Sequence, residues 1–292
     1  MSESVVRTEH LTKRFDGHTV LRDVSVSAEA GDVIGVLGKN GAGKTTLLEV
    51  LLGFSPPSDG SSEIFGHESL RLPEAVKARI GFVPQRDELV EMMTVDQQLS
   101  VAACLHPGWN AELVNRLARE WDVARRERIW KLSVGERQKL SILLALGHEP
   151  DLLVFDEPVA SLDPMARRAF LQQLWDLSAG SRKTILFSSH IISDLERSAN
   201  KVWILRDGGL AWQGSLDALK ESVVRLHVRA RRPLGRTLDV PHVIASRVEG
   251  ATAVASVAEW QPDRREQIAR DLDADVEIER LGLEEIFMEL HR

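Results

Sequence analysis

One glycine-rich stretch, residues 38–46, constrains this chain more than any other. It reads Gly-Lys-Asn-Gly-Ala-Gly-Lys-Thr-Thr and fits the phosphate-binding pattern G-x-x-x-x-G-K-[ST]. The apolar run before it, residues 32–37, predicts a buried strand, and residues 46–53 predict a helix that ends at a glycine. A strand, a glycine loop and a helix start direct backbone N–H groups and the positive end of a helix dipole at one point. The stretch therefore predicts a binding site for a nucleoside triphosphate.

Each residue type in this loop has a physical task. Glycines allow the backbone to wrap closely around phosphate oxygens, which a Cβ would obstruct. Lys44 is expected to bridge the β- and γ-phosphates, and the Thr45 hydroxyl is expected to bind Mg²⁺. A chance glycine-rich turn is the alternative, and the correct flanking segments argue against it. The residues predicted to bind the ATP phosphates are Gly38, Asn40, Gly41, Ala42, Gly43, Lys44, Thr45 and Thr46.

Composition limits the class of protein. The chain has 292 residues, of which 43% are hydrophobic and 28% charged, as in a soluble globular protein with one large domain or a large and a small one. Its net charge of −7 gives no general attraction to nucleic acid, so no nucleic-acid partner is expected. The N-terminus lacks the apolar core of a signal peptide, and no apolar run approaches the ~18 residues that would span a bilayer. Any membrane role is therefore expected to depend on a partner.

A single cysteine, Cys104, excludes a disulfide within this chain and fits a reducing compartment. Its apolar neighbours predict a small buried side chain.

Near the N-terminus, alternating segments predict strands joined by a turn at Asp16-Gly17. Phe15, just before that turn, is either a stacking platform or a core aromatic at the end of a strand.

The middle of the chain changes from strand-like to helical patterning and back. Residues 94–130 have helical periodicity, and they lie within a predicted helical insertion at about residues 88–147. Ser133 and Glu136 form an S-x-x-E capping box at the start of a further helix. Beyond about residue 220, alternating segments and two helical segments predict a small α+β unit, which carries no recognisable motif.

Two apolar runs predict buried parallel strands with chemistry at their ends. Residues 152–155 lead directly into Asp156 and Glu157, and residues 184–189 lead into His190. The carboxyl ends of such strands are where parallel sheets bind ligands. The two acids could instead merely cap the turn where the strand passes into a loop. The histidine could instead have a structural role. A short strand that ends at a proline places Gln85 at its end.

These motifs occur in an order that resembles the nucleotide-binding subunit of ATP-binding cassette (ABC) transporters. The resemblance covers roughly residues 3–220 and includes Leu-Ser-Val-Gly-Glu at 132–136 and Ser-Leu-Asp at 161–163. It implies an α/β fold: a RecA-like P-loop NTPase core, an antiparallel β subdomain and an inserted helical subdomain. The implied domains are residues 1–220 for the ATPase and residues 221–292 for the small C-terminal α+β unit.

The resemblance assigns a role to each site residue. Phe15 stands where an aromatic ring stacks on adenine. Asp156 would hold Mg²⁺ together with Thr45, and Gln85 would reach the metal and the attacking water. Glu157 would be the general base. His190 would contact the γ-phosphate, and Asp163 would belong to a loop at the dimer contact.

The signature segment departs from the usual Leu-Ser-Gly-Gly-Gln of this family. Ser133 and Gly135 are retained, and they would meet the γ-phosphate bound by a second subunit. Val134 would be strained if the site needs a positive φ there. Glu136 would add a negative charge near phosphate, although the start of a helix tolerates an acid well.

The resemblance implies an Mg²⁺-dependent ATPase subunit that is most similar to bacterial exporter-type (ABC-2-like) systems. It would dimerise head to tail, as a homodimer or with a second cassette. It would drive a separate transmembrane permease from the cytoplasmic side, peripheral at the inner face of the cell membrane. One alternative is an ABC ATPase in translation or DNA repair, against which the single cassette and the absence of sustained heptads argue. The other is an ATP-binding regulatory partner with weak hydrolysis, against which Glu157 and His190 argue.

Overall fold

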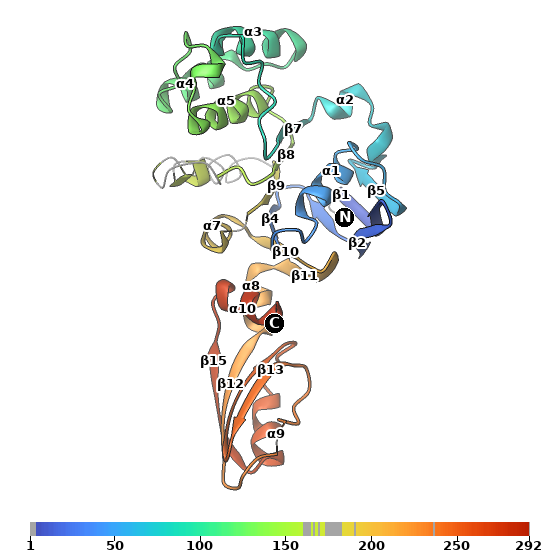
Figure 1. The fold of residues 1–292 in the computed structure, drawn as a ribbon, viewed down its shortest axis with the longest axis vertical. Helices are drawn as coiled ribbons and strands as arrows, with labels where there is room; N and C mark the ends of the chain where they lie inside the picture. Colours follow the sequence, from blue (N-terminus) through green and yellow to red (C-terminus); the bar gives the residue numbers. More distant parts are fainter. Residues whose placement is uncertain are drawn as a thin grey trace. The chain divides into compact units, whose positions relative to one another are not determined.

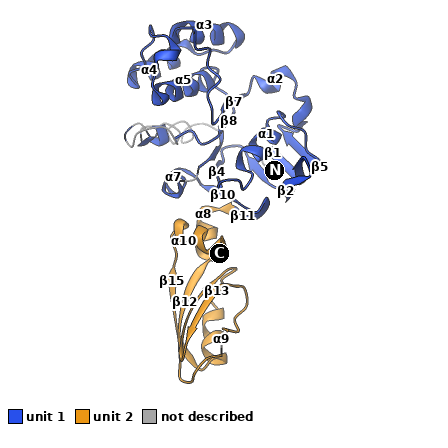
Figure 2. Cartoon of the chain, in the orientation of Figure 1, with its two compact units in different colours: residues 1–213 blue, residues 214–292 orange. Residues whose placement is uncertain are grey.

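The structure is a computed structural model that describes residues 4–159, 165, 167, 168, 170–172, 183–189, 191–235 and 237–291. The chain divides into two compact units, Met1–Gln213 and Gly214–Arg292 (Figure 2). The boundary that was expected after residue 220 falls inside helix α8 (Leu216–Ser222), which belongs to the second unit.

An antiparallel sheet begins the first unit. Its strands have the order β2-β1-β5-β6, and β3 pairs with β1. Strands β1 and β2 form the predicted hairpin, in which Asp16 and Gly17 both have positive φ, 46° and 84°. Two consecutive positive φ angles match the right-handed twist of a hairpin. The strand bounds are β1 (Ser4–Phe15), β2 (His18–Val24), β3 (Ser27–Glu29), β5 (Asp59–Ile64) and β6 (His67–Glu68).

The second sheet of this unit has the order β11-β10-β4-β9-β8-β7, and its central neighbours are parallel. Strands β4, β8 and β9 are buried along their whole length. Strands that are covered on both faces need continuous apolar runs, which explains why these segments do not alternate. The bounds are β4 (Val33–Leu37), β7 (Ile80–Val83), β8 (Leu152–Phe155), β9 (Thr184–Ser188), β10 (Lys201–Arg206) and β11 (Gly209–Ser215).

Helices α3, α4 and α5 lie together at one end of the first unit (Figure 1). Each begins at a side chain that accepts a hydrogen bond from a backbone N–H of the first turn: Thr94, Asn110 and Ser133. Cys104, predicted to be buried, is exposed on α3. A helix that packs on one side exposes the other: Val95 and Leu99 are buried, whereas Val101 and Leu105 are exposed like Cys104. The helices of this unit that are described from end to end are α1 (Lys44–Leu51), α2 (Glu74–Lys77), α3 (Val95–Leu105), α4 (Ala111–Glu120), α5 (Val134–Leu146) and α7 (Ile192–Ser198), with 3-10 turns at Ser69–Arg71 and Ile129–Lys131.

The second unit is an antiparallel sheet with helices, as the alternating and helical segments beyond about residue 220 predicted. Its strands have the order β13-β14-β12-β15, and alternate residues of β12 are buried in a separate apolar core. Strand β13 and helix α8 were not predicted. The bounds are β12 (Val224–Ala230), β13 (Val243–Glu249), β14 (Thr252–Val257), β15 (Ala274–Arg280), α8 (Leu216–Ser222), α9 (Arg264–Asp271) and α10 (Leu283–Leu290). Within the described ranges, no helix has both the length and the apolar character that crossing a membrane requires.

Candidate nucleotide site

The glycine-rich loop connects strand β4 to helix α1. Gly41 and Gly43 both have positive φ, 82° and 98°. A Cβ on Gly43 would lie 2.7 Å from a methyl carbon of Leu21, so this position requires glycine for its conformation and for its space. Gly43 precedes α1 and provides no capping side chain. The first N–H groups of the helix are therefore available to an anion.

A cavity of about 250 Å³ opens onto this loop. Gln85 and Glu157, which follow strands β7 and β8, line it together with six of the eight predicted phosphate-binding residues. Gly38 and Ala42 support the loop from within, since a Cβ on Gly38 would lie 2.9 Å from the Ala42 Cβ, and Ala42 is buried. The lining residues are Val20, Asn40, Gly41, Gly43, Lys44, Thr45, Thr46, Gln85 and Glu157. Val20 was not anticipated, because it looks like an ordinary strand residue.

Lys44 and Glu157 face each other in this cavity. The Lys44 Nζ atom donates to the Gly38 carbonyl oxygen at 2.9 Å and lies 3.5 Å from Glu157 Oε1. Both side chains are less than one-tenth exposed. A lysine at the phosphate loop suits the phosphates of a nucleotide, and a carboxylate beside it suits proton abstraction from water. The two residues are 113 positions apart in the chain, and the parallel pairing of strands brings them together.

Ser188 organises the two acids at the end of β8. Its hydroxyl donates to Asp156 Oδ1 at 2.6 Å and accepts from the Glu157 backbone N–H at 2.7 Å. Phe155 pairs with Phe187, so the residues that follow on the two strands lie side by side. Sequence reasoning missed Ser188. The available signal was a polar residue at the end of an otherwise apolar strand.

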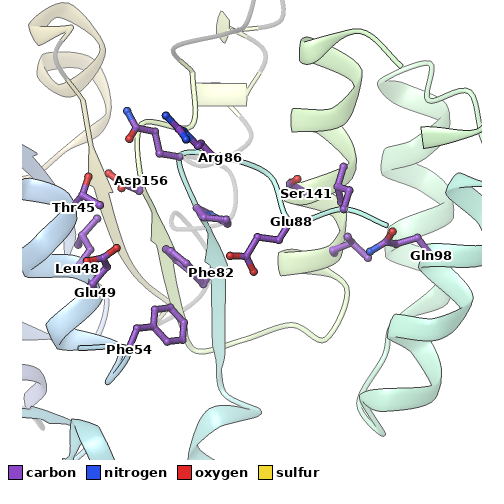
Figure 3. Close-up of a pocket in the computed structure, with 14 residues that line it drawn as sticks. Thr45, Leu48, Glu49, Phe54, Phe82, Arg86, Glu88, Gln98, Ser141 and Asp156 are labelled. Carbon is purple, nitrogen blue, oxygen red and sulfur yellow. The ribbon is translucent and has the colours of Figure 1, made fainter. Parts of the chain in front are cut away.

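A larger cavity, of about 640 Å³, lies beside the first and shares Thr45 and Gln85 with it (Figure 3). In the close-up, side chains of α1 lie on one side, and Ser141 and Gln98 of the helical block lie on the other. Asp156 also lines this cavity. A hydroxyl, an amide oxygen and a carboxylate are the hard oxygen ligands that Mg²⁺ prefers, so Thr45, Gln85 and Asp156 fit this metal. The remaining lining residues are Leu48, Glu49, Phe54, Phe82, Pro84, Arg86, Glu88, Leu89, Gln98, Ser141 and Leu144.

Phe15 is the last residue of β1, and 43% of its surface is exposed. The ring is therefore not a core aromatic. The Lys13 Nζ atom lies 4.6 Å from the ring centroid, a favourable cation–π distance. The adenine-stacking role of Phe15 stays a prediction.

The signature residues form the start of α5. Ser133 and Val134 are exposed, and none of the residues 132–136 lines either of the two cavities described above. Val134 is the first residue of the helix and has no positive φ, so the expected strain does not arise. Hydrogen bonds from the Ser133 hydroxyl and then from its backbone N–H lower the pKa of Glu136. Asp163 and His190, predicted for the dimer contact and the γ-phosphate, lie outside the described residues.

Comparison with known proteins identifies the same family that the order of the motifs predicted. Residues 21–160 match the family model described as ABC transporter. The chain is 30% identical over 224 residues to the ABC transporter ATP-binding protein YtrB of Bacillus subtilis (strain 168), covering 77% of this chain and 76% of the relative. It is 31% identical over 271 residues to the Nod factor export ATP-binding protein I of Paraburkholderia xenovorans (strain LB400), covering 90% of this chain and 89% of the relative.

Solved structures agree with the sequence relatives. The structure of an ATP-binding subunit of an ABC transporter matches with a TM-score of 0.67 and 30% identity, and the match covers 74% of this chain and 92% of that chain. The nucleotide-free ATP-binding cassette of an ABC transporter, at 23% identity and a TM-score of 0.63, shows the same fold. The predicted P-loop NTPase fold and the predicted family are therefore confirmed. This chain belongs to the ATP-binding proteins of ABC transporters, a family of ATPases.

Proposed function

We propose that this protein is the Mg²⁺-dependent ATPase subunit of an exporter and that it drives a separate membrane permease. The observation that carries the proposal is the position of the Glu157 carboxylate, 3.5 Å from Lys44 inside the phosphate-loop cavity. A carboxylate there can accept a proton as water attacks the γ-phosphate. Ser188 supports this role, because its bond to the Glu157 N–H holds the base in place.

The other site residues bind and orient the nucleotide. The N–H groups of the loop and Lys44 hold the phosphates, and the exposed ring of Phe15 offers adenine a stacking surface. Mg²⁺, bound through Thr45, Gln85 and Asp156, would neutralise charge on the β- and γ-phosphates. His190 would add a contact to the γ-phosphate.

We propose a head-to-tail dimer in which the signature of one subunit completes the site of the other. The exposure of Ser133 and its position outside the two cavities support this arrangement. Gly135 and Asp163 would take part in the same contact. The partner cassette is a second copy of this chain or a related one.

We propose that the permease binds over the larger cavity, with the ATPase at the inner face of the membrane. Phe54 is 65% exposed there, and its ring centroid lies 5.4 Å from that of Phe82 in a tilted arrangement, which gives the cavity an apolar wall. Gln85 lines both cavities, so a change at the phosphates would reach the bound permease directly. Export is favoured because the relative from Paraburkholderia xenovorans is named for Nod factor export.

The test is the Glu157→Gln variant. Loss of the base should lower the steady-state rate of ATP hydrolysis by about 100-fold or more while ATP binding persists. With Mg·ATP, the variant should form a dimer whose mass is measured in solution. Glu120→Gln, an exposed change on α4, is the control and should hydrolyse ATP at the wild-type rate. Wild-type hydrolysis by Glu157→Gln would refute this mechanism, and a variant that binds ATP and stays monomeric would show that Mg·ATP alone does not close a homodimer of this chain.

A further inference from the structure

At the start of α5, the carboxylate of Glu136 accepts hydrogen bonds from Ser133, the serine of the signature segment 132–136. Ser133 Oγ donates to Glu136 Oε2 at 2.7 Å, and the Ser133 backbone N–H donates to the same oxygen at 2.8 Å. The Glu136 N–H returns a bond to Ser133 Oγ at 3.3 Å. An ionised carboxylate only accepts hydrogen bonds. The hydroxyl proton of Ser133 is therefore directed to Glu136.

The charged groups around Glu136 leave it ionised, and the nearby charge of Lys139 favours that ionised form. Lys139, a nearby cation, donates its Nζ hydrogen bond to the Trp121 carbonyl oxygen at 2.9 Å. Glu127, a nearby acid, is paired with Lys131 at 3.0 Å. Within the residues that the structure describes, no cation forms an ion pair with Glu136. The start of α5 therefore presents a full negative charge beside Ser133.

This charge matters if the start of α5 meets the triphosphate of a second subunit, which is the head-to-tail arrangement proposed above. A helix start attracts phosphate through its N–H groups and dipole, an effect equivalent to about half a positive charge. One ionised carboxylate in the first turn more than offsets that partial charge for an approaching anion. The hydroxyl that could donate to the γ-phosphate is already engaged with Glu136.

We propose that Glu136 is an electrostatic brake on ATP-driven closure of the dimer. It weakens closure by repelling the γ-phosphate of the opposing subunit and by holding the Ser133 hydroxyl proton. The proposal rests on the proposed function, because it requires a composite site. It assigns Glu136 a positioning role, which it exerts through Ser133, and no part in the chemical step.

The experiment measures dimer affinity in the hydrolysis-deficient Glu157→Gln background with Mg·ATP. Glu136→Gln preserves the capping box, since glutamine at this position also accepts from the serine N–H, and it removes the charge. Both composite sites lose the repulsion, so the dissociation constant of the dimer should fall by about tenfold or more at low salt. Sedimentation over a range of protein concentrations gives this constant.

Salt separates the brake from a merely structural effect. Repulsion is screened over a Debye length of about 10 Å at 0.1 M ionic strength. The advantage of Glu136→Gln should therefore shrink between about 0.05 M and about 0.5 M NaCl. Glu136→Asp, which keeps the charge, should remain as weak as the parent. Glu120→Gln on α4 changes the net charge equally and should not tighten the dimer.

Three other outcomes would contradict the proposed brake. If the Glu157→Gln parent dimerises with ATP and the added Glu136→Gln change does not tighten the dimer, the brake is wrong and the proposed function stands. A gain that is independent of salt, or shared by Glu136→Asp or by Glu120→Gln, would exclude repulsion at the composite site as the cause. If neither the parent nor Glu136→Gln dimerises although both bind ATP, the brake and the homodimeric form of the proposed function both fail.

Discussion

At the scale of single residues, the buried Ser188 positions the two acids Asp156 and Glu157. Ser188 is fully buried, and its one hydroxyl both donates to Asp156 and accepts from the Glu157 N–H. Glu157 has a φ of 50°, a conformation that residues other than glycine seldom adopt. The hydrogen bond to its N–H offsets this cost. Ser188 thus positions the proposed metal ligand and the proposed base together.

We expect Ser188→Ala to lower the rate of ATP hydrolysis by about 10–100-fold, the usual effect of removing a side chain that hydrogen-bonds to a metal ligand. It should also lower the free energy of unfolding by about 1–3 kcal/mol, because two buried polar groups lose their partner. Steady-state turnover and denaturant unfolding measure the two effects. Ser189→Ala is the control, since the Ser189 hydroxyl accepts from the Ile191 N–H and donates to the Ile191 carbonyl oxygen. Equal loss of turnover in both variants would contradict the role of Ser188.

At the scale of elements, an ion pair connects the segment after β7 to the signature helix. Arg137, on the first turns of α5, donates to both carboxylate oxygens of Asp87, at 3.0 and 2.8 Å. Its Nη2 atom also lies 3.2 Å from Glu91. Both members of the bidentate pair are about four-fifths buried, so solvent screens it little. The residues that follow Gln85 and the helix that presents Ser133 are therefore held together.

We expect Asp87→Asn to lower the free energy of unfolding at pH 7 by about 1–3 kcal/mol. Hydrogen bonds from Arg137 hold the pKa of Asp87 below its usual value. The folded state then binds fewer protons than the unfolded state, so this stability is complete above the ordinary pKa of about 4 and is lost as the pH falls through the folded pKa. Unfolding curves of wild type and variant from pH 7 to about pH 3 should converge at the acid end.

Asp96→Asn is a suitable comparison, because Asp96 pairs with Arg125 at a more exposed position. Its loss should cost less, about 0–1 kcal/mol, as surface ion pairs usually do. Equal losses in the two variants, or a difference between wild type and Asp87→Asn that persists at acid pH, would rule out a special contribution of the Asp87–Arg137 pair.

At the scale of the whole molecule, the two units have separate apolar cores. In the first unit, buried residues of the antiparallel sheet, α1 and the parallel strands pack into one cluster. In the second, the buried face of β12 packs with β14, β15 and α9, and Leu226 is fully buried there. Separate cores allow separate local stabilities, because loss of packing in one core leaves the contacts of the other intact.

Leu226→Ala should therefore destabilise the second unit by about 2–5 kcal/mol while the first unit keeps its protection. Hydrogen exchange, read separately for residues 1–213 and 214–292, measures this. ATP binding should persist. Leu153→Ala in β8 is the reciprocal variant and should lower protection in the first unit only. Loss of protection in β4, β8 and β9 of Leu226→Ala would contradict independent cores.

Several errors of sequence reasoning share one cause: burial depends on partners that are distant in the chain. Cys104 has apolar neighbours in sequence, yet it lies on the exposed side of α3. Strand β13 alternates weakly, and its pairing with β14 defines it as a strand. In the sequence, Ser188 is only a polar residue at the end of a strand, and its role is visible only in the fold, where its hydroxyl donates to Asp156.

The sequence by itself determined what depends on local backbone chemistry. Gly41 and Gly43 specify a loop that only glycine can form, and Ser133 with Glu136 specifies the start of a helix within four consecutive residues. The buried parallel strands were readable because strands covered on both faces must be continuously apolar. Only the tertiary structure decided which side chains meet. Lys44 faces Glu157 because β9 pairs with both β4 and β8, and strand pairing between distant segments is set by packing of the whole core.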